Sequence, residues 1–427
     1  MADRVVLMSI PQLRHRDVTP GALASLDDLA AKGSMAELVP AFPGLAASSF
    51  ATLVTGTGPY EHGMIGDAYF DRATRRVVCG PLPDSAVMMP RLWDRVRAAR
   101  PEARTLVWFA PNARGVDVDV AAWVDPGAKL MTQPPGLAES LVRQFGPLPV
   151  PSPGRGSEPP RLETTSWLLK TAAAVIAAEQ PTLSVVRVPY LGQVARRFGP
   201  DGREACRAVT ELEAVLSRFL AALPAGTLTI ALTESVTTPV SGPVYPNRIL
   251  RSIGMLALQP VPGGGLDVDL DASTAFAITD HQICHIYLND PSQAAAVATA
   301  FSGPRAEGVA HVAPGSQRAA LGLDHPRAGD VVLVACPDRW FAPDWWKTPA
   351  EAPRGPAAAC GLAQASPIGF LDPAQVKGSL GAPPPNAEYH GVIIASEPDA
   401  LGEDTRIAAR DVAVIVLSST ARKAPVR

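Results

Sequence analysis

The chain has 427 residues, 47% of them hydrophobic and 19% charged, so it can bury a core larger than that of one simple domain. Its formal net charge of −3 gives no general attraction to nucleic acid or to an anionic membrane surface. No apolar stretch approaches the roughly 20 residues of a membrane span, and no signal peptide is predicted before the first strand-like run. The five cysteines are scattered and include no Cys-x-x-Cys pair, which favours reduced thiols in a cytoplasmic protein over a zinc cluster.

Short apolar runs alternate with helical patterns through the first half of the chain. The runs are typical of buried parallel strands and cover residues 5–10, 105–109, 183–188 and 227–232. Helices are predicted from Thr19-Pro20 onward, over 90–99 and 165–179, and behind Asp201-x-x-Glu204, which has the form of a capping box. This alternation predicts right-handed crossovers and a mainly parallel sheet covered by helices on both faces.

The second half of the chain has a different pattern of predicted helices and strands. Helical patterns at 247–254 and 294–301 flank strand-like segments at 276–279 and 285–288, which we interpret as an inserted α+β cap. The run 331–335 resumes the buried-strand pattern of the core, and two late strands are predicted at 392–395 and 412–417. The proline-rich stretches 147–160 and 343–385 predict irregular loops. The expected fold class is therefore α/β, with the core in 1–240 and 324–427 and the cap in 241–323.

The segment from Phe42 to Gly58 predicts a helix that follows a Pro/Gly turn and ends at Gly56. Unpaired backbone N–H groups at such a helix start attract anions, and enzymes place nucleophiles and phosphates there. Ser48 and Ser49 lie near its first turn. One of them could be a nucleophile, but no neighbouring base can be named, and a capping or first-turn hydroxyl is the more common role.

Several spaced motifs resemble the type I phosphodiesterase/nucleotide pyrophosphatase branch of the alkaline phosphatase superfamily. They are Arg4 to Leu13, Phe42-Pro43, Ala51 to Gly56, Glu61-His62-Gly63 and Tyr69-Phe70-Asp71, and the similarity extends to about Ser396. The resemblance implies an alkaline phosphatase-like fold with two metal ions, usually zinc, held by Asp and His side chains at the carboxyl ends of the strands. It also implies a threonine or serine nucleophile at the start of the helix described above.

The positions that match the family's reactive residues mostly carry other side chains here. They are Ala46 at the nucleophile, and Pro11, Gly192, Arg196, Ser235 and Leu380 at metal ligands. Among the matched ligand positions only Glu234 keeps a ligand side chain, in the segment Thr233-Glu234-Ser235-Val236. Zinc is held by three or four N, O or S ligands. The resemblance therefore implies a degenerate member without a cofactor, and zinc is expected only if the matched positions are wrong.

Other motifs, including Thr238-Pro239-Val240, Asn247-Arg248 and Asp280-His281-Gln282, resemble a bacterial subgroup described only as similar to these phosphodiesterases. That subgroup already has Glu in place of one metal-binding Asp. It generally keeps the threonine and the late histidine, which this chain lacks at Ala46 and Leu380. The chemistry of the subgroup is therefore a poor guide to this protein.

Two groups of polar residues could replace the lost chemistry. Arg196 and Glu234 are expected to face each other, either as an internal salt bridge or with Arg196 binding an anionic ligand in place of the metal charge. Asp280, His281 and Gln282 with His285 form the densest polar cluster, and the two histidines are expected to share one face of a strand. Acid/base chemistry, a single-metal site and a satisfied structural turn all fit that cluster.

Three functions follow from these observations. The first is a catalytically silent homologue, a pseudoenzyme, that binds a small anionic ligand or a protein partner at the old cleft. The second is an enzyme repurposed to metal-independent chemistry in a biosynthetic pathway, using residues such as Arg196, Glu234, Asp280 and His281. The third is an active metal-dependent phosphodiesterase with relocated ligands. None of them predicts a nucleic-acid or membrane partner.

Overall fold

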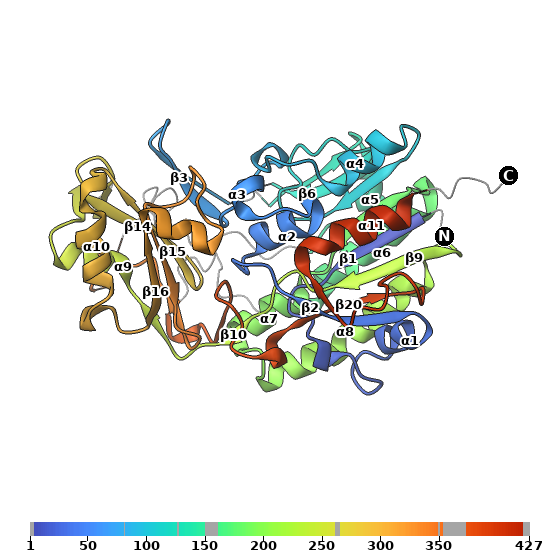
Figure 1. The fold of residues 1–427 in the computed structure, drawn as a ribbon. Helices are drawn as coiled ribbons and strands as arrows, with labels where there is room; N and C mark the ends of the chain where they lie inside the picture. Colours follow the sequence, from blue (N-terminus) through green and yellow to red (C-terminus); the bar gives the residue numbers. More distant parts are fainter. Residues whose placement is uncertain are drawn as a thin grey trace.

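The computed structural model describes residues 4–80, 82–125, 128–149, 161–260, 265–348, 351–352 and 373–421. Most of the two proline-rich stretches predicted as loops, 150–160 and 353–372 in particular, lies outside these residues. A sheet flanked by helices forms the core, and a smaller cap stands beside one end of it (Figure 1).

The core sheet has nine strands, and most of them run parallel, as predicted. Within it β9, β1, β8, β5 and β6 are mutually parallel, whereas β20 and β7 are antiparallel to their neighbours. The order across the sheet is β21 (Arg406–Ala408), β2 (Ser34–Val39), β20 (Gly391–Ala395), β9 (Thr227–Leu232), β1 (Arg4–Ser9), β8 (Leu183–Arg187), β5 (Thr105–Trp108), β6 (Val120–Val124) and β7 (Leu130–Gln133).

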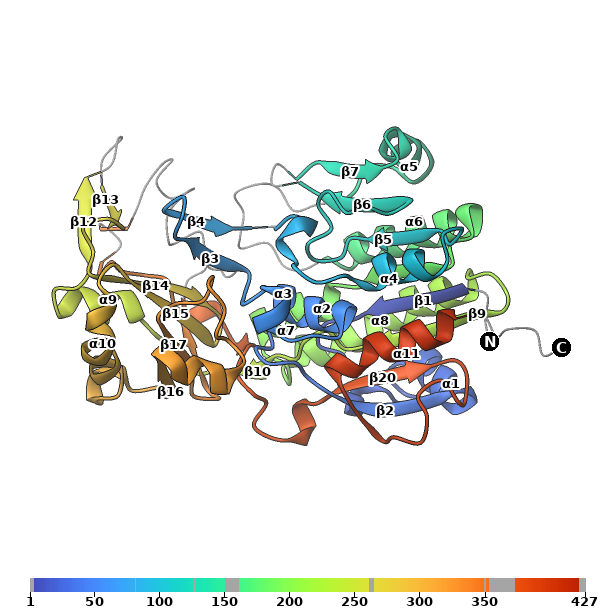
Figure 2. The ribbon, with the colours of Figure 1, turned by 45° about the horizontal axis from the view of Figure 1, so that its top comes forward.

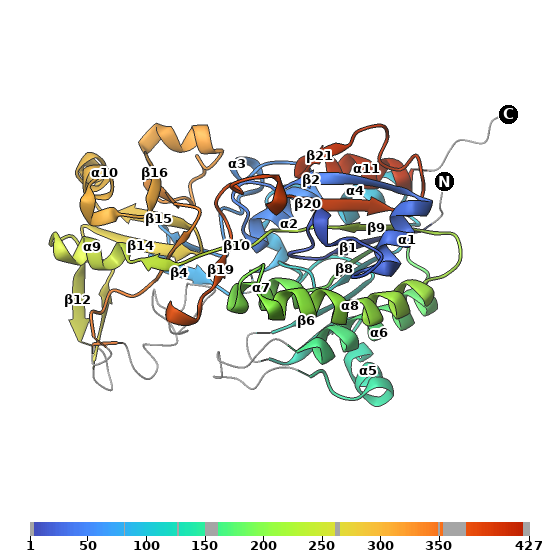
Figure 3. The same cartoon turned by 90° about the horizontal axis from the view of Figure 1, so that it is seen from below.

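Alternate residues of β1 point into two separate hydrophobic clusters, because successive side chains of a strand face opposite sides of the sheet. Val6 and Met8 pack with α1 (Ala24–Lys32), α5 (Leu137–Phe145), α6 (Leu162–Glu179), α7 (Tyr190–Phe198) and α8 (Arg203–Ala221). Val5 and Leu7 pack with α2 (Ala46–Thr55), α4 (Leu92–Ala99) and α11 (Val412–Thr420). Figure 3 shows α6, α7 and α8 along one side of the sheet. Helices therefore cover both faces, as the sequence predicts.

The cap is built on an antiparallel sheet in the order β14 (Ala275–Asp280), β15 (Ile283–Leu288), β17 (Val331–Ala335) and β16 (Val309–Pro314). Its other elements are α9 (Pro246–Ser252), α10 (Ala294–Phe301), and the hairpin of β12 (Ala257–Pro260) with β13 (Leu266–Asp269). The cap joins the core through β10 (Thr238–Pro239) paired with β19 (Gly378–Ser379), and β11 (Gly242–Val244) pairs with β18 (Arg339–Phe341).

The structure corrects the predicted boundary between core and cap. Residues 331–335 form β17, which pairs with β15 and β16 of the cap and not with the core sheet. The hairpin of β3 (Ala68–Asp71) and β4 (Arg76–Cys79) also extends to the cap (Figure 2). There the centroid of the Phe70 ring lies 4.9 Å from that of the Phe276 ring. The cap thus includes residues from both segments that were assigned to the core.

Three local predictions are also wrong. Residues 412–417 form part of the helix α11 and not a strand, and the helix expected from Thr19-Pro20 begins only at Ala24. The predicted capping box at Asp201 is absent, because the N-cap of α8 is Gly202.

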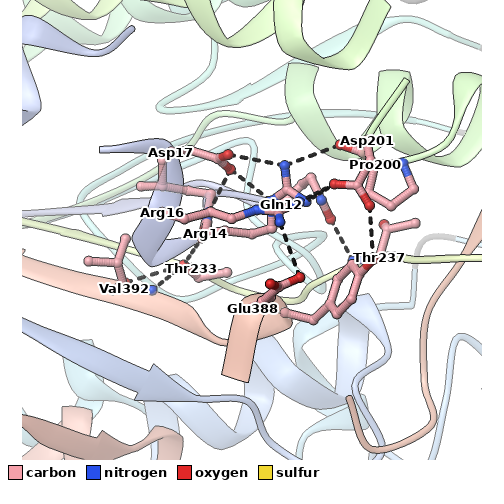
Figure 4. A network of polar contacts seen from close by, with 12 residues as sticks. Gln12, Arg14, Arg16, Asp17, Pro200, Asp201, Thr233, Thr237, Glu388 and Val392 are labelled. Atoms are coloured by element: carbon pink, nitrogen blue, oxygen red, sulfur yellow. Dashed lines mark hydrogen bonds and ion pairs between the residues drawn. The ribbon is translucent and has the colours of Figure 1, made fainter. Parts of the chain in front are cut away.

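Asp201 instead belongs to a polar network that holds the loop after β1 (Figure 4). Its Oδ1 accepts a hydrogen bond of 2.6 Å from the buried Arg14, and its Oδ2 accepts one of 2.8 Å from the Tyr389 hydroxyl. Arg14 also donates to Asp17 and to the Pro200 carbonyl. The network connects segments far apart in sequence, so it fixes the chain just beyond Pro11.

None of the helices that the structure describes is both long enough and apolar enough to cross a membrane.

Candidate functional site

The carboxyl ends of the parallel strands and the start of α2 meet on the side of the core that faces the cap (Figures 1 and 2). Arg187 ends β8, Glu234 follows β9, and Ala46 begins α2. In parallel α/β sheets ligands bind at the carboxyl ends of the strands. This region is therefore the candidate site.

The positions that match lost metal ligands are closed by packing. A Cβ atom on Gly192 would lie 3.0 Å from the Cβ of Pro11, so the two positions are in direct contact. Ser235 and Leu380 are buried, and their carbonyl oxygens accept backbone hydrogen bonds from Gln12 (2.7 Å) and Gln282 (3.0 Å). An aspartate at position 192 would need its neighbour to move.

Glu234 is paired with Arg187, not with Arg196 as the sequence suggested. Both carboxylate oxygens accept from one guanidinium, with Oε1 2.7 Å from Nη2 and Oε2 2.9 Å from Nε. The Ser9 hydroxyl donates a further 2.9 Å bond to Oε2. This bidentate geometry is that of a strong, directional ion pair. Glu234, the one side chain at the matched positions that could still bind a metal, is therefore already engaged by Arg187.

Arg196 is partly buried, and its guanidinium makes no hydrogen bond or ion pair within the described residues. Burial lowers its pKa, and the nearby positive charge of Arg187 acts in the same direction. The carboxyl groups of Asp67, Asp280 and Glu234 lie close enough to oppose this shift. Arg196 therefore carries a positive charge that no direct partner neutralises, beside the Glu234 pair.

Asp67 is an acidic residue of the site that none of the sequence motifs indicates. Its Oδ1 accepts a 2.9 Å hydrogen bond from the Ala47 N–H in the first turn of α2. Its own N–H donates to Oδ2 of Asp280 at 2.7 Å. Asp67 thus occupies the helix start where an anionic ligand would be expected, and it links that start to the cap.

The carboxyl groups of Asp67 and Asp280 both have raised pKa values. Burial raises the pKa of Asp67, and it raises the pKa of Asp280 well above its ordinary value, with the neighbouring Asp67 charge adding to the effect. Asp280 is fully buried, and its Oδ1 has no hydrogen-bond partner in the described structure. Burial of an unpaired carboxylate is costly, which favours the neutral form of Asp280.

The predicted cluster around Asp280 is only partly brought together. His281 lies in the turn between β14 and β15 with φ of 58°, so it does not share a strand face with His285 in β15, and that expectation is wrong. Its Nδ1 is 3.5 Å from the Ser379 hydroxyl, and burial keeps its pKa well below the ordinary value. His281 is therefore a neutral, buried imidazole.

Gln282 and His285 make structural contacts. The Gln282 Nε2 donates to the carbonyls of Pro337 and Arg339, both at 3.1 Å. The His285 Nδ1 accepts from the Gly329 N–H at 3.3 Å, and burial lowers the pKa of His285 to about 4. These bonds fix the turn and the return of the chain through the cap.

Ser48 and Ser49 are both fully buried in α2. The Ser49 hydroxyl donates to the Pro43 carbonyl at 3.4 Å, and the Ser48 hydroxyl has no partner among the described residues. Ala46 and Ala47, not the serines, line the adjacent cavity. Neither hydroxyl is thus presented there as a nucleophile.

A cavity of about 440 Å³ opens beside the start of α2. This volume is within the range of small-molecule sites. Polar and charged side chains that line it are Asp67, Asn112, Arg114, Thr164, Arg187 and Gln193, and the bulky apolar ones are Leu82, Phe109, Trp123, Val124, Leu148 and Leu168. The arrangement suits a ligand that has both an anionic group and an apolar body.

The side chains of this site do not fit a two-metal centre. No group of three or more His, Cys, Asp or Glu side chains that could hold a metal ion occurs in the part of the chain that the structure describes. Such ions need several oxygen, nitrogen or sulfur ligands each, and Glu234 is already engaged by Arg187.

The sheet, its two helical layers and the cap define an α/β protein of the alkaline phosphatase-like fold. The family model described as type I phosphodiesterase/nucleotide pyrophosphatase matches residues 5–359, and the chain belongs to that family. The sequence comparison finds an uncharacterized pyrophosphatase/phosphodiesterase of Schizosaccharomyces pombe, 23% identical over 220 residues. That match covers 51% of this chain and 40% of the yeast protein, so the chain matches less than half of its relative's length.

Two kinds of solved structure share the fold at low sequence identity. Murine ectonucleotide pyrophosphatase/phosphodiesterase 5 superposes with a TM-score of 0.66 at 13% identity, covering 98% of this chain and 95% of that one. An inactive variant of the murine protein, in complex with AMP, gives 0.65 at 13% identity over 97% and 94%. Phosphonoacetate hydrolase from Sinorhizobium meliloti, in complex with phosphonoformate, gives 0.64 at 13% identity over 98% and 96%.

Proposed function

We propose that this protein is a catalytically silent member of its family that binds a phosphate-bearing ligand without metal ions. The observation that carries the proposal is the bidentate pair of Arg187 with Glu234, at 2.7 and 2.9 Å. At positions where the family has metal ligands, this chain has the Arg196 guanidinium and the contact between Gly192 and Pro11. At the nucleophile position, Ala46 offers no oxygen. On the scattered cysteines we place the protein in the reducing cytoplasm.

Anion binding is supported by the charge distribution. Arg196 has no direct partner within the described chain, and Arg114 and Arg187 line the adjacent cavity. A phosphate group accepts charge-assisted hydrogen bonds from such guanidinium groups. The cavity also offers apolar surface, so we propose a phosphate ester with an aromatic body, for which AMP is a suitable probe because it binds the related murine variant.

A second candidate function is metal-independent acid/base chemistry. It is supported by the buried pair of Asp67 and Asp280, whose raised pKa values would let one carboxyl group keep a proton, and so donate it, at a higher pH than an ordinary aspartate. Turnover of a bound ligand in the presence of EDTA, lost in Asp280→Asn, would favour this candidate over a silent protein.

The proposal is tested by calorimetric titration of AMP in EDTA, with the wild type and Arg196→Ala. We expect binding by the wild type and a loss of tenfold or more in the variant, because a charge-assisted hydrogen bond contributes about 1.5–3 kcal/mol. Arg197→Ala removes the same charge from the next position of α7 and is the matched control, with an expected change below about twofold.

Metal content and hydrolysis are measured on the same preparations. We expect no bound zinc and no turnover of bis(4-nitrophenyl) phosphate. Stoichiometric zinc together with turnover would support the metal-dependent phosphodiesterase with relocated ligands and would overturn the proposal. Absence of AMP binding would instead favour a protein partner at the old cleft.

A further inference from the structure

The loop that follows β5 forms one wall of the cavity and has an unusual backbone. Phe109 and Asn112 have φ angles of 52° and 57°, in the left-handed region that residues other than glycine rarely adopt. The bulky Phe109 is the less tolerant of the two. Such conformations persist only where the surrounding structure enforces them, and they are found preferentially at binding and active sites.

Asn112 places an unpaired amide in this wall. The residue is 8% exposed, and its Nδ2 atom is buried without a hydrogen-bond partner among the described residues. Leaving a buried donor unpaired costs about 1–3 kcal/mol. Because Asn112 also lines the cavity, a ligand bound there could satisfy the amide.

The surroundings of Asn112 indicate which part of a ligand it would meet. Phe109 and Trp123, from the ends of β5 and β6, give the cavity aromatic surface, and Leu168 adds an aliphatic side chain. Among the charged residues of the same cavity, Asp67 and Arg187 come from other elements of the site, whereas Arg114 lies two residues after Asn112 in the same loop. The apolar surface beside the Asn112 amide suits an aromatic ring that carries a hydrogen-bonding atom.

We propose that Asn112 is a specificity-determining residue that recognises a hydrogen-bond acceptor on the aromatic body of the bound phosphate ester. The inference rests on the proposed function, because it needs a phosphate ester in this cavity. It goes beyond that function by distinguishing heteroaromatic esters, such as purine nucleotides, from hydrocarbon aryl esters. Sites that hydrogen-bond a substrate group discriminate strongly against analogues without that group.

The test compares AMP with 1-naphthyl phosphate, which has a bicyclic aromatic body without ring nitrogens. Binding of both is measured by calorimetry with the wild type and Asn112→Gly. Glycine removes the amide and keeps the left-handed φ without strain, so it is a better variant than alanine. We expect AMP to bind about five- to tenfold more weakly in the variant, and 1-naphthyl phosphate to bind within twofold of the wild type.

The outcomes separate the two proposals. Equal weakening of both ligands, or weakening of neither, overturns the role of Asn112 and leaves the proposed function standing. Failure of the wild type to bind either ligand overturns both. Retained binding of 1-naphthyl phosphate also shows that the variant is folded, so a selective loss of AMP cannot come from unfolding.

Discussion

At the scale of single residues, Asp67 is the group whose removal should have the most informative effect. Its carboxylate accepts the Ala47 N–H at 2.9 Å and so competes with an external anion for the start of α2. We predict that Asp67→Asn binds sulfate about tenfold more tightly than the wild type at pH 8, because a negative charge beside the anion is removed. Calorimetry measures the affinity, and sulfate is chosen because it does not titrate in this range.

The same argument predicts how sulfate affinity changes with pH, because the charge of Asp67 depends on pH. Burial raises the pKa of Asp67, so its carboxyl group becomes neutral at a higher pH than an ordinary aspartate. Wild-type sulfate affinity should therefore rise as the pH falls through this pKa, and the variant should depend less on pH. Asp71→Asn, at an exposed carboxylate of β3, is the control and should match the wild type. Weaker sulfate binding by Asp67→Asn would show that Asp67 helps to hold the anion.

The residues of the site were only partly predictable from the sequence. The family motif placed Glu234 and Arg196 in this region, and the structure has both there. The motif could not show that Arg187 forms the ion pair with Glu234. The position of Arg187, a cation at the carboxyl end of a buried strand, is a sequence feature that could have indicated it. Asp67 follows a glycine in a loop and belongs to no motif that we used. Its role depends on a contact with Asp280, 213 positions away, which no local pattern contains.

At the scale of elements, β20 lies against the loop after β9 with no spare room. A Cβ atom on Gly391 would lie 2.5 Å from the Cβ of Thr233, whose hydroxyl accepts from the Val392 N–H at 2.8 Å. We predict that Gly391→Ala lowers the free energy of unfolding by about 1–3 kcal/mol, the usual cost of overpacking. Urea unfolding measures the change. The Gly391→Ala substitution would also move the segment that carries Glu234.

Gly242→Ala is the matched control for this prediction. Its added Cβ would meet nothing within 4 Å, and its φ is not in the left-handed region. We expect its unfolding free energy to stay within about 0.5 kcal/mol of the wild type. A Gly391→Ala variant as stable as Gly242→Ala would contradict the close packing of β20 against Thr233.

Element types were predicted well where hydrophobic periodicity decided them, and less well elsewhere. Residues 412–417 suggested a strand because they are rich in Val and Ile. The buried positions of α11 include Val412, Ala413, Val416 and Ser419, a helical spacing that continues past the predicted end. For residues 331–335, an unbroken apolar run correctly indicated a strand buried on both faces. It could not indicate which of two sheets the strand would join.

At the scale of the whole molecule, core and cap each contain a buried neutral histidine. His62 in α3 (Pro59–His62) accepts a 3.1 Å hydrogen bond at Nδ1 from the Met64 N–H, and its Nε2 is 3.0 Å from the Thr52 hydroxyl. Burial, with a further contribution from His325, lowers the pKa of His62 to about 3. In the cap, burial lowers the pKa of His285 to about 4.

These depressed pKa values predict that the fold loses stability in acid. An unfolded histidine takes up a proton below about pH 6.5, whereas folded His62 does so only near pH 3. The stabilisation is therefore complete above pH 6.5 and is lost as the pH falls toward 3. Between pH 6.5 and 5 each histidine should reduce the free energy of unfolding by about 2 kcal/mol. Asp67 and Asp280, whose pKa values are raised, act in the opposite direction.

The contribution of His62 is isolated by comparing urea unfolding of the wild type and His62→Gln at several pH values from 7.5 to 5. The variant should be less stable at pH 7.5, because its side chain does not reproduce both imidazole hydrogen bonds. The difference between the two proteins should shrink by about 2 kcal/mol on acidification, since the variant has no imidazole to protonate when it unfolds. His311→Gln, at an exposed position of β16, should keep the wild-type pH dependence. A constant difference between the wild type and His62→Gln would mean that His62 is protonated in the fold, and that solvent reaches this part of the core near the cap.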